Sequence, residues 1–376
     1  MTSANLIADI SLYDVKVNSQ TTWRHVQLTT NGGLTGLGEA TLHDIGPEFA
    51  ERLLETGQTL KQKYPDISIL DPLRLQEGGL ACRTILSAYD QAICDLQAQI
   101  AGQPLHAFLG AKPLDASLSL YANINRATGS RNPENFADNA KSAADNGFQA
   151  IKIAPFDGLD PTICDTEEGR DLIDAGIARI KATRNAVPDK ELMVDCHWRL
   201  TPKAAFALLP ELQDAGVTWF ECPLPENAEA IPELRQLRHD ANQRGIRLCG
   251  LETAGTWTDI APFVEGETYD LIMPDVKHAC GLQNILDIGS RAENMGVGIS
   301  LHNPTGPVAH LFSAHVMAAL GSCERMEIQW NESPIFFDLI HPAPVITTGT
   351  CRPTDTPGLG AVMLNGAEYR RHHIDS

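Results

Sequence analysis

The segment ELMVDCHWRL, residues 191–200, indicates the fold because of the way its apolar run ends. Residues 192–194 have the character of a buried strand, and Asp195 and His197 then follow two positions apart. Side chains at positions i and i+2 of a strand lie on one face. The sequence therefore predicts a carboxylate and an imidazole that project together from the end of a buried strand.

Segments of the same kind recur along the chain and alternate with helical patterns. Residues 135–148 and 202–216 carry apolar residues at helical spacing, and each has a glycine near its end. Strands that alternate with helices predict parallel pairing through right-handed crossovers, and eight of them favour a closed barrel. The expected strands are 117–124, 150–156, 191–196, 218–224, 247–253, 269–275, 297–303 and 325–329.

The chain is expected to divide into three segments. Residues 1–115 do not show the strand–helix alternation. Their pattern is a hairpin around Asn31 followed by helices, which predicts a smaller α+β domain. Residues 116–330 hold the barrel, and residues 331–376 are too short for a core of their own, so they should pack on the amino-terminal domain. The stretch GGLTGLG, 32–38, lacks the Lys-Ser/Thr pair of a nucleotide-binding loop, and we interpret it as a turn.

Composition excludes several classes of protein. The chain has 29 Lys and Arg against 48 Asp and Glu, a formal net charge of −19, which argues against nucleic acid as a partner. It has neither a recognisable secretory signal nor about 18 consecutive apolar residues, so we expect no membrane partner and a cytoplasmic location. The nine cysteines include no CxxC pair, which argues against a zinc ribbon or a disulfide framework.

Ionisable residues stand at the carboxyl ends of the expected strands, where barrel enzymes keep their chemistry. One acidic residue in such a place is commonly a helix cap or an ion-pair partner, but here the pattern recurs on seven of the eight strands. Several carboxylates in one barrel mouth repel each other unless a cation compensates, and oxygen ligands suit Mg²⁺. The residues are Lys152, Asp195, His197, Glu221, Glu252, Asp275, His302 and Glu327.

These motifs resemble the enolase superfamily, and within it the mandelate racemase subgroup. The resemblance covers nearly the whole chain and is strongest at VDCH, WFECPLPEN, PDV and LHNPTGP. It implies an α/β fold, a modified TIM (β/α) barrel with an α+β capping domain, in which Asp195, Glu221 and Glu252 bind Mg²⁺. It also implies that His302 is the base, with Asp275 as its partner.

The resemblance assigns further roles around that dyad. A carboxylate bonded to one imidazole nitrogen fixes the tautomer and raises the basicity of the other nitrogen. Glu327 corresponds to the residue that meets the substrate carboxylate, and with a raised pKa it could donate a hydrogen bond there. Asp-x-His on the third strand is similar to that of galactonate-type acid-sugar dehydratases, in which His197 would be the acid.

The sequence departs from the subgroup at two places. The Lys-x-Lys of racemases and muconate cycloisomerases is reduced to Lys152, because Ala154 replaces the second lysine. Lys152 would then contact the substrate carboxylate, and Ala154 cannot be a base. Cys222 stands where many members have an acidic residue beside the metal-binding glutamate.

These features together predict a Mg²⁺-dependent dehydratase acting on an aldonate or aldarate and giving a 2-keto-3-deoxy acid. Asn123 and Trp23 are expected to contact this small carboxylate substrate, with the capping loops 20–23 and 42–46 setting specificity. The family resemblance suggests a homo-oligomer. A cycloisomerase or epimerase of the same superfamily is the main alternative, and a barrel that binds sugars without turning them over is another.

Overall fold

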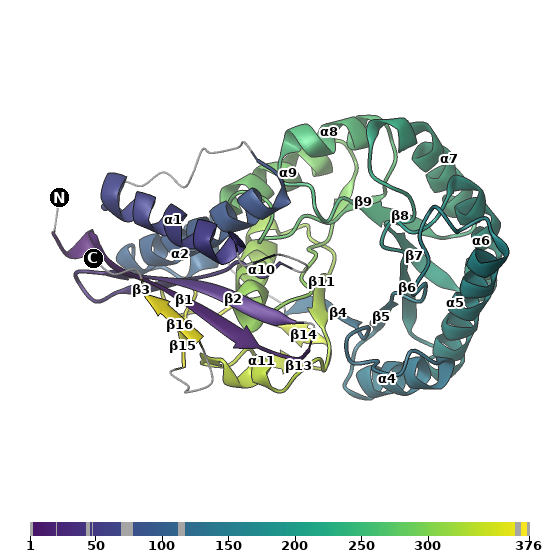
Figure 1. Ribbon diagram of the computed structural model, residues 1–376, viewed down its shortest axis with the longest axis horizontal. Coiled ribbons are helices and arrows are strands. Elements are labelled where there is room, and N and C mark those ends of the chain that lie inside the picture. Colours follow the sequence, from purple (N-terminus) through teal and green to yellow (C-terminus); the bar gives the residue numbers. More distant parts are fainter. Residues whose placement is uncertain are drawn as a thin grey trace.

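The computed structural model describes residues 3–19, 21–42, 46, 48–68, 78–111, 117–364 and 370–373. Two parts are visible in Figure 1: a ring of strands inside an arc of helices, and a sheet with two helices packed to one side of it. No helix in the described part of the chain is both long enough and apolar enough to cross a membrane. All nine cysteines are free thiols.

The ring contains eight parallel strands in chain order, as the sequence predicts. Regular pairing runs from β10 through β9, β8, β7, β6, β5 and β4 to β11. Between β11 and β10 there is no regular ladder, and the single bridge pair Leu301–Met326 spans this seam. The α/β fold with a parallel sheet is therefore confirmed. The strands are β4 (Leu118–Asn123), β5 (Ala150–Ile153), β6 (Glu191–Asp195), β7 (Val217–Glu221), β8 (Arg247–Gly250), β9 (Leu271–Ile272), β10 (Gly298–Ile299) and β11 (Met326–Gln329).

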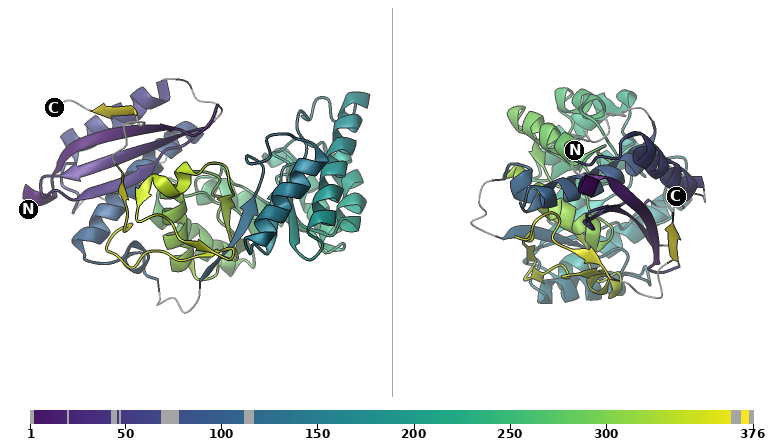
Figure 2. Two further views of the ribbon diagram at one scale, coloured as in Figure 1. Left: turned by 90° about the horizontal axis from the view of Figure 1, so that it is seen from below. Right: turned by 90° about the vertical axis from the view of Figure 1, so that its left-hand side faces the viewer.

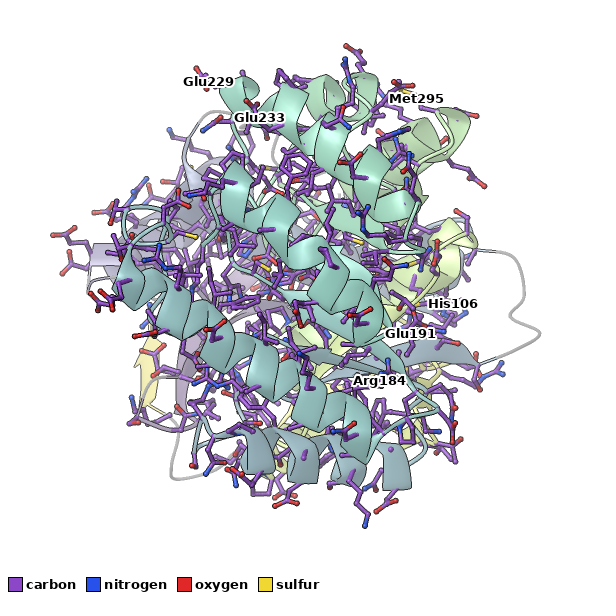
Figure 3. The ribbon with its side chains drawn as sticks, turned by 90° about the vertical axis from the view of Figure 1, so that its right-hand side faces the viewer. His106, Arg184, Glu191, Glu229, Glu233 and Met295 are labelled. Carbon is purple, nitrogen blue, oxygen red and sulfur yellow. The ribbon has the colours of Figure 1, made fainter. Side chains whose placement is uncertain are left out.

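Helices cover the outside of these strands, and their ends follow from local sequence. Asn132 accepts a hydrogen bond from the Asn135 amide to cap α4, and Thr201 caps α6 in the same way. Glu191, at the start of β6, and Glu229, beyond the end of β7, lie well apart across this helical face in Figure 3. The helices are α4 (Pro133–Asp145), α5 (Glu167–Ala186), α6 (Pro202–Asp214), η2 (Ala228–Ala230), α7 (Ile231–Asn242), α8 (Trp257–Glu265), α9 (Leu282–Asn294) and α10 (Pro307–Leu320).

A separate apolar cluster fills the inside of the barrel. It is formed by side chains from six of the strands and by Met273, which follows β9, and it is distinct from the larger core between strands and helices. Such a cluster gives the polar groups above it a water-poor floor. Its members are Tyr121, Ala150, Met193, Trp219, Cys249, Leu271 and Met273.

The amino-terminal part is an antiparallel sheet covered by two helices. The sheet has the order β16–β1–β2–β3, with η1 (Ser3–Asn5), β1 (Ile7–Lys16), β2 (Thr22–Thr30), β3 (Thr35–Glu39), α1 (Glu48–Lys63) and α2 (Leu80–Ile100). Gly36 and Gly38 let α2 pack directly on β3, because a Cβ atom on either would lie within about 2 Å of an α2 carbonyl oxygen. The glycine-rich stretch thus joins two paired strands and packs a helix, in agreement with the turn interpretation.

The carboxyl-terminal residues contact both parts. Strand β16 (Arg370–His373) pairs with β1, and Figure 2 shows the two termini at the same end of the molecule. Strands β13 (Ile346–Thr347) and β14 (Thr350–Cys351) form a hairpin that extends the barrel sheet at β4. The remaining elements are α3 (Leu105–Phe108), α11 (Ile335–Asp338), β12 (Ile340–His341) and β15 (Val362–Met363). The division at residues 115 and 330 stays a prediction.

Glu39, at the end of β3, joins the amino-terminal sheet to the barrel. Its buried carboxylate accepts hydrogen bonds from the Gly306 and Ala309 amides, each at 2.9 Å. These are amides at the start of α10, which has no capping side chain of its own. A carboxylate at this helix terminus also complements the helix dipole. The sheet therefore fixes where α10 begins, five residues after His302.

We predict that Glu39→Gln destabilises the protein and that the loss depends on pH. Burial by itself raises the pKa of Glu39, but His25, the Ala309 amide and Lys277 outweigh it and lower the pKa to about 2. A carboxyl whose folded pKa is depressed stabilises the fold above its unfolded pKa of 4.5 and loses this contribution as pH falls towards 2. The shift corresponds to about 3 kcal/mol at neutral pH.

Urea denaturation of wild type and variant at pH 7 and at about pH 3.5 would measure the difference in unfolding free energy. It should be largest at pH 7 and shrink at the lower pH. Glu324→Gln, which removes a surface partner of Arg247, is the matched control and should change little. A Glu39 variant as stable as wild type at pH 7 would contradict this role.

Candidate active site

Three carboxylates stand at the ends of three consecutive strands. Asp195 and Glu221 are the last residues of β6 and β7 and pair with each other in register, and Glu252 lies two residues beyond β8. All three side chains are buried. The residues around them adopt left-handed backbone conformations that non-glycine residues rarely take: His197, Trp198, Cys222 and Leu251 have φ between 44° and 69°. Strain of this kind concentrates at functional sites.

Lys152 on β5 is the cation of this cluster. Its Nζ lies 2.6 Å from Glu221 Oε1 and 3.0 Å from Glu327 Oε1, and the lysine is only 1% exposed. Asn123 Nδ2 donates to the same oxygen of Glu327 at 2.6 Å. Lys152 and Asn123 are therefore bonded to protein carboxylates, which a substrate carboxylate would have to approach or replace.

The pKa values show that one ammonium does not neutralise these carboxyls. Although burial disfavours its charged form, Glu221 and Glu327 hold the pKa of Lys152 well above its usual range. Burial raises the pKa of Glu221 to about 8, although Lys152 acts to lower it. The pKa of Glu252 is raised well above its usual range by burial and by the charges of Asp195 and Glu221. The cluster therefore retains protons that a further cation could replace.

The pKa of Glu327 is lowered, whereas its expected role as a hydrogen-bond donor needs a raised pKa. Burial acts to raise its pKa, but Lys152, His302 and the amide of Asn123 outweigh burial and lower it. Its second oxygen accepts from the Asn303 amide at 3.1 Å. In this state Glu327 is a charged acceptor and not a hydrogen-bond donor.

His302 and Asp275 form the expected pair, and a lysine joins it. His302 Nδ1 lies 2.8 Å from Asp275 Oδ2, while its Nε2 lies 3.3 Å from Glu252 Oε2 and 3.9 Å from Glu327 Oε2. Lys277 Nζ contacts the same oxygen of Asp275, and the Lys277 amide donates to the other at 2.7 Å. The bond at Nδ1 favours a proton there, so Nε2 faces the carboxylates with its lone pair. The His302 side chain is 13% exposed, less than a rim position would be.

His197 lies beyond the strand and not on it. Strand β6 ends at Asp195, and His197 sits in a turn, so the expected strand alternation does not extend to it. Its ring nevertheless returns to Asp195, with Nε2 2.8 Å from Oδ2, and its amide donates to Oδ1 at 2.9 Å. Burial raises the pKa of Asp195, but His197 outweighs it and holds that pKa below the usual range. The His197 side chain is 40% exposed and is thus open to a ligand.

The donor set of Asp195, Glu221 and Glu252 suits a hard cation, although the three do not form a finished metal site. Within the described ranges, no three His, Cys, Asp or Glu side chains form a group that could hold a metal ion as they stand. Lys152 and His197 occupy oxygens of two of the three carboxylates. Glu252 Oε2, however, is buried without a hydrogen-bond partner. Buried carboxyls that retain protons, together with one unsatisfied oxygen, fit a hard cation such as Mg²⁺.

Asn123 and Trp23, the two predicted substrate contacts, stay predictions. Trp23 lies on β2, fully buried, with its ring 6.2 Å from that of Phe336. Of the capping loops, residues 20 and 43–45 lie outside the described residues. His310 and His315 are buried on α10.

Two aromatic residues that were not predicted from the sequence support the charged cluster. Trp219 Nε1 donates to Glu221 Oε2 at 3.0 Å, and Tyr121 OH lies 3.4 Å from Lys152 Nζ. Both stand two residues before a strand-end polar residue, so strand alternation could have indicated them. Strand alternation could not have indicated Lys277, because this residue lies in a turn after β9.

Comparison with known proteins agrees with these observations. The family model described as Enolase C-terminal domain-like matches residues 135–367. D-xylonate dehydratase of Haloferax volcanii is 25% identical over 385 residues, covering 95% of this chain and 88% of that protein. D-galactonate dehydratase of Ralstonia pickettii is 24% identical over 359 residues, covering 90% and 88%. D-gluconate dehydratase of Thermoproteus tenax is 29% identical over 283 residues, covering 74% of this chain and 54% of that protein.

Solved structures share the fold over nearly the whole chain. A member of the enolase superfamily from Salmonella Typhimurium superposes with a TM-score of 0.83 at 20% identity, covering 98% of this chain and 100% of that one. A mandelate racemase/muconate lactonizing enzyme from Sulfitobacter gives 0.82 at 20% identity, covering 95% and 93%. At these identities the likeness concerns the fold.

We predict that Lys152→Met destabilises the metal-free protein by about 3–5 kcal/mol, because Glu221 and Glu327 lose their shared counter-charge. The loss should grow with pH, since buried carboxyls with raised pKa values resist ionisation while the unfolded chain ionises freely. Thermal and urea denaturation between about pH 6 and pH 8 would measure it. Lys181→Met, which removes an exposed pair with Glu211, should leave the midpoint nearly unchanged. Equal stability of the two variants would argue against the proposed role of Lys152.

Proposed function

Because the chain belongs to the enolase superfamily, we propose that it is a hydro-lyase that removes water from an acid sugar, an aldonate or aldarate, to give a 2-keto-3-deoxy acid. The observation that carries the proposal is the setting of His302. One ring nitrogen is held by Asp275, and the other faces the carboxylate cluster around Lys152. The dehydratase names among its relatives support the same reaction type.

The first step would be removal of the proton next to the substrate carboxylate. His302 Nε2 takes this proton, and the electron pair of the broken C–H bond moves into the carboxylate as an ene-diolate. Asp275 stabilises the imidazolium that forms, because its carboxylate is already bonded to Nδ1. Lys152 would supply positive charge to the ene-diolate once the substrate displaces one of its two carboxylate partners.

The second step would be loss of the 3-hydroxyl group. The electron pair returns from the ene-diolate, the C–O bond breaks, and His197 donates a proton so that the group leaves as water. The resulting enol takes up a proton at C3 and releases its hydroxyl proton, which gives the 2-keto acid. The exposed ring of His197 fits a proton donor, because it is open to a bound ligand.

Asp195, Glu221 and Glu252 would hold Mg²⁺ in the loaded enzyme. The bound cation would supply positive charge to the substrate carboxylate and lower the energy of the ene-diolate. Binding requires Glu221 and Asp195 to give up contacts with Lys152 and His197, which frees Lys152 and His197 for the substrate.

Dehydration suits the residues better than epimerisation. An epimerase returns the proton from the other face of the substrate, and the subgroup's second lysine is replaced here by Ala154, which has no titratable group. His197 supplies an acid that an epimerase does not need. Asn123 and Trp23 as substrate contacts, a homo-oligomeric assembly and a cytoplasmic location stay predictions.

We predict that variants of His302 and His197 affect different steps of the reaction. In D₂O, with the acid sugar that gives keto acid in a screen of stereoisomers, His302→Asn should reduce both α-proton exchange and keto-acid formation by about 10²–10⁴-fold. His197→Asn should keep exchange and lose most of the keto acid. Proton NMR and a keto-acid assay would follow both processes.

Exchange without keto acid in the wild type would favour the epimerase alternative. Equal loss of both processes in the His197 variant would remove its assignment as the acid. No exchange with any acid sugar in the presence of Mg²⁺ would contradict the proposed reaction.

We predict that Mg²⁺ stabilises the substrate-free protein. A ligand at 100 times its dissociation constant raises the unfolding free energy by about 2.7 kcal/mol. Differential scanning fluorimetry with increasing MgCl₂ should show a rising midpoint, and Glu252→Gln should abolish most of the rise. Glu324→Gln, which removes a surface carboxylate, is the matched control and should keep the rise. A rise that survives in the Glu252 variant would mean that the cation binds elsewhere.

A further inference from the structure

One glutamine in the amino-terminal part connects the two segments that carry the catalytic pair. Gln91, in the middle of α2, is fully buried. Its Nε2 donates to the Val276 carbonyl oxygen at 2.9 Å, and its Oε1 accepts from the Glu39 amide at 2.9 Å. Val276 follows Asp275 directly. Glu39 in turn holds the first amides of α10, shortly after His302.

The same face of α2 holds the whole segment 276–282. Thr84 Oγ1 lies 2.9 Å from His278 Nδ1, Ser87 Oγ accepts from the Cys280 amide at 2.9 Å, and Asp90 Oδ2 accepts from the Leu282 amide at 2.7 Å. These three residues and Gln91 are spaced so that they lie on one face of the helix. They contact every second residue of the segment, at 276, 278, 280 and 282.

Close packing makes this contact specific. Gly281 has φ of 140°, and a Cβ atom there would lie 3.0 Å from Asp90 Oδ1. Figure 1 shows α2 beside α9, which begins where this segment ends. A side chain at position 281 would therefore press against Asp90.

The orientation of Asp275 depends on this segment. Its Oδ1 accepts from the Lys277 amide at 2.7 Å, and its Oδ2 is shared by Lys277 Nζ and His302 Nδ1. A shift of the backbone at 276–278 would turn the carboxylate and change the angle at which His302 is held. The Val276 carbonyl, bonded to Gln91, lies between Asp275 and Lys277.

We propose that Gln91 is a positioning residue that keeps Asp275 and His302 aligned, by bonding at once to the segment after β9 and, through Glu39, to the start of α10. The inference rests on the proposed function, because alignment matters for catalysis only if His302 is the base. Gln91 itself does not touch the substrate or the reacting atoms.

A second glutamine on α2 provides a matched control. Gln99 Nε2 also makes two hydrogen bonds, to the Thr35 carbonyl oxygen at 2.7 Å and to Asp95 Oδ1 at 2.8 Å. Both partners lie in the amino-terminal part, away from the segment after β9. Gln91→Met and Gln99→Met each keep the length of the side chain and remove its hydrogen bonds. The two variants thus separate loss of stability from loss of alignment.

The test measures kcat and KM for α-proton exchange in the magnesium-loaded enzyme, together with the melting temperature. Gln91→Met should lower kcat by about 10–100-fold, as loss of a group that orients a catalytic residue commonly does, with KM changed less than about twofold. Gln99→Met should lower the melting temperature and leave kcat within about twofold of wild type. Equal kcat values in the two variants would overturn the proposal.

A crystal structure of Gln91→Met gives a readout that needs no substrate. The His302 Nδ1–Asp275 Oδ2 distance should exceed the 2.8 Å of the wild type, or the ring should turn away from Glu252. An unmoved pair would overturn the inference even if the enzyme is active. A displaced pair in a protein inactive on every acid sugar would support the alignment role while contradicting the proposed reaction.

If Gln91→Met does not fold, Ser87→Ala removes only the bond to the Cys280 amide. It should move kcat and the pair in the same direction by a smaller factor. Wild-type kcat and an unchanged pair in this variant would overturn the proposal for the helix face as a whole.

Discussion

The buried ion pairs of Lys152 are the constraint on which the rest of the site depends. Glu221 and Glu327 share its ammonium, and the apolar floor formed by Tyr121, Trp219 and their neighbours keeps water from screening the charges. Buried carboxylates are tolerated only when paired, and breaking such a pair costs more than the pair itself contributes. The strand ends therefore form a single electrostatic unit, in which adding or moving one charge changes the protonation of the others.

The proposed catalytic pair, Asp275 and His302, is held from outside the barrel. Asp275 and His302 follow β9 and β10, which are two residues long each and give little regular pairing to fix what comes after them. Hydrogen bonds from α2 and from Glu39 supply the missing support. The amino-terminal sheet thus does more than cover the barrel, because without it the two segments would end in poorly paired turns.

Much of the site could be predicted from the sequence because strand alternation is a short-range property. Asp195, Glu221 and Glu327 end or lie on strands as expected, and each projects into the barrel. His197 departs because the backbone turns into a left-handed conformation at that residue, which the strand pattern does not reveal. Gln91, Glu39 and Lys277 could not be found, since their roles come from contacts between segments far apart in the chain. A glutamine within an apolar helix face gives no sign of which loop it holds.

Gly306 indicates how closely the two parts are coupled. A Cβ atom at this position would lie 2.8 Å from Glu39 Oε2 and 3.1 Å from Trp23 Cδ2. The glycine of HNPTGP is therefore required by the amino-terminal sheet, because any side chain would push the start of α10 away from Glu39. Trp23, the predicted substrate contact on β2, is packed against the segment that follows His302. A ligand that moves Trp23 would therefore also move that segment, which couples the predicted substrate contact to the alignment of His302.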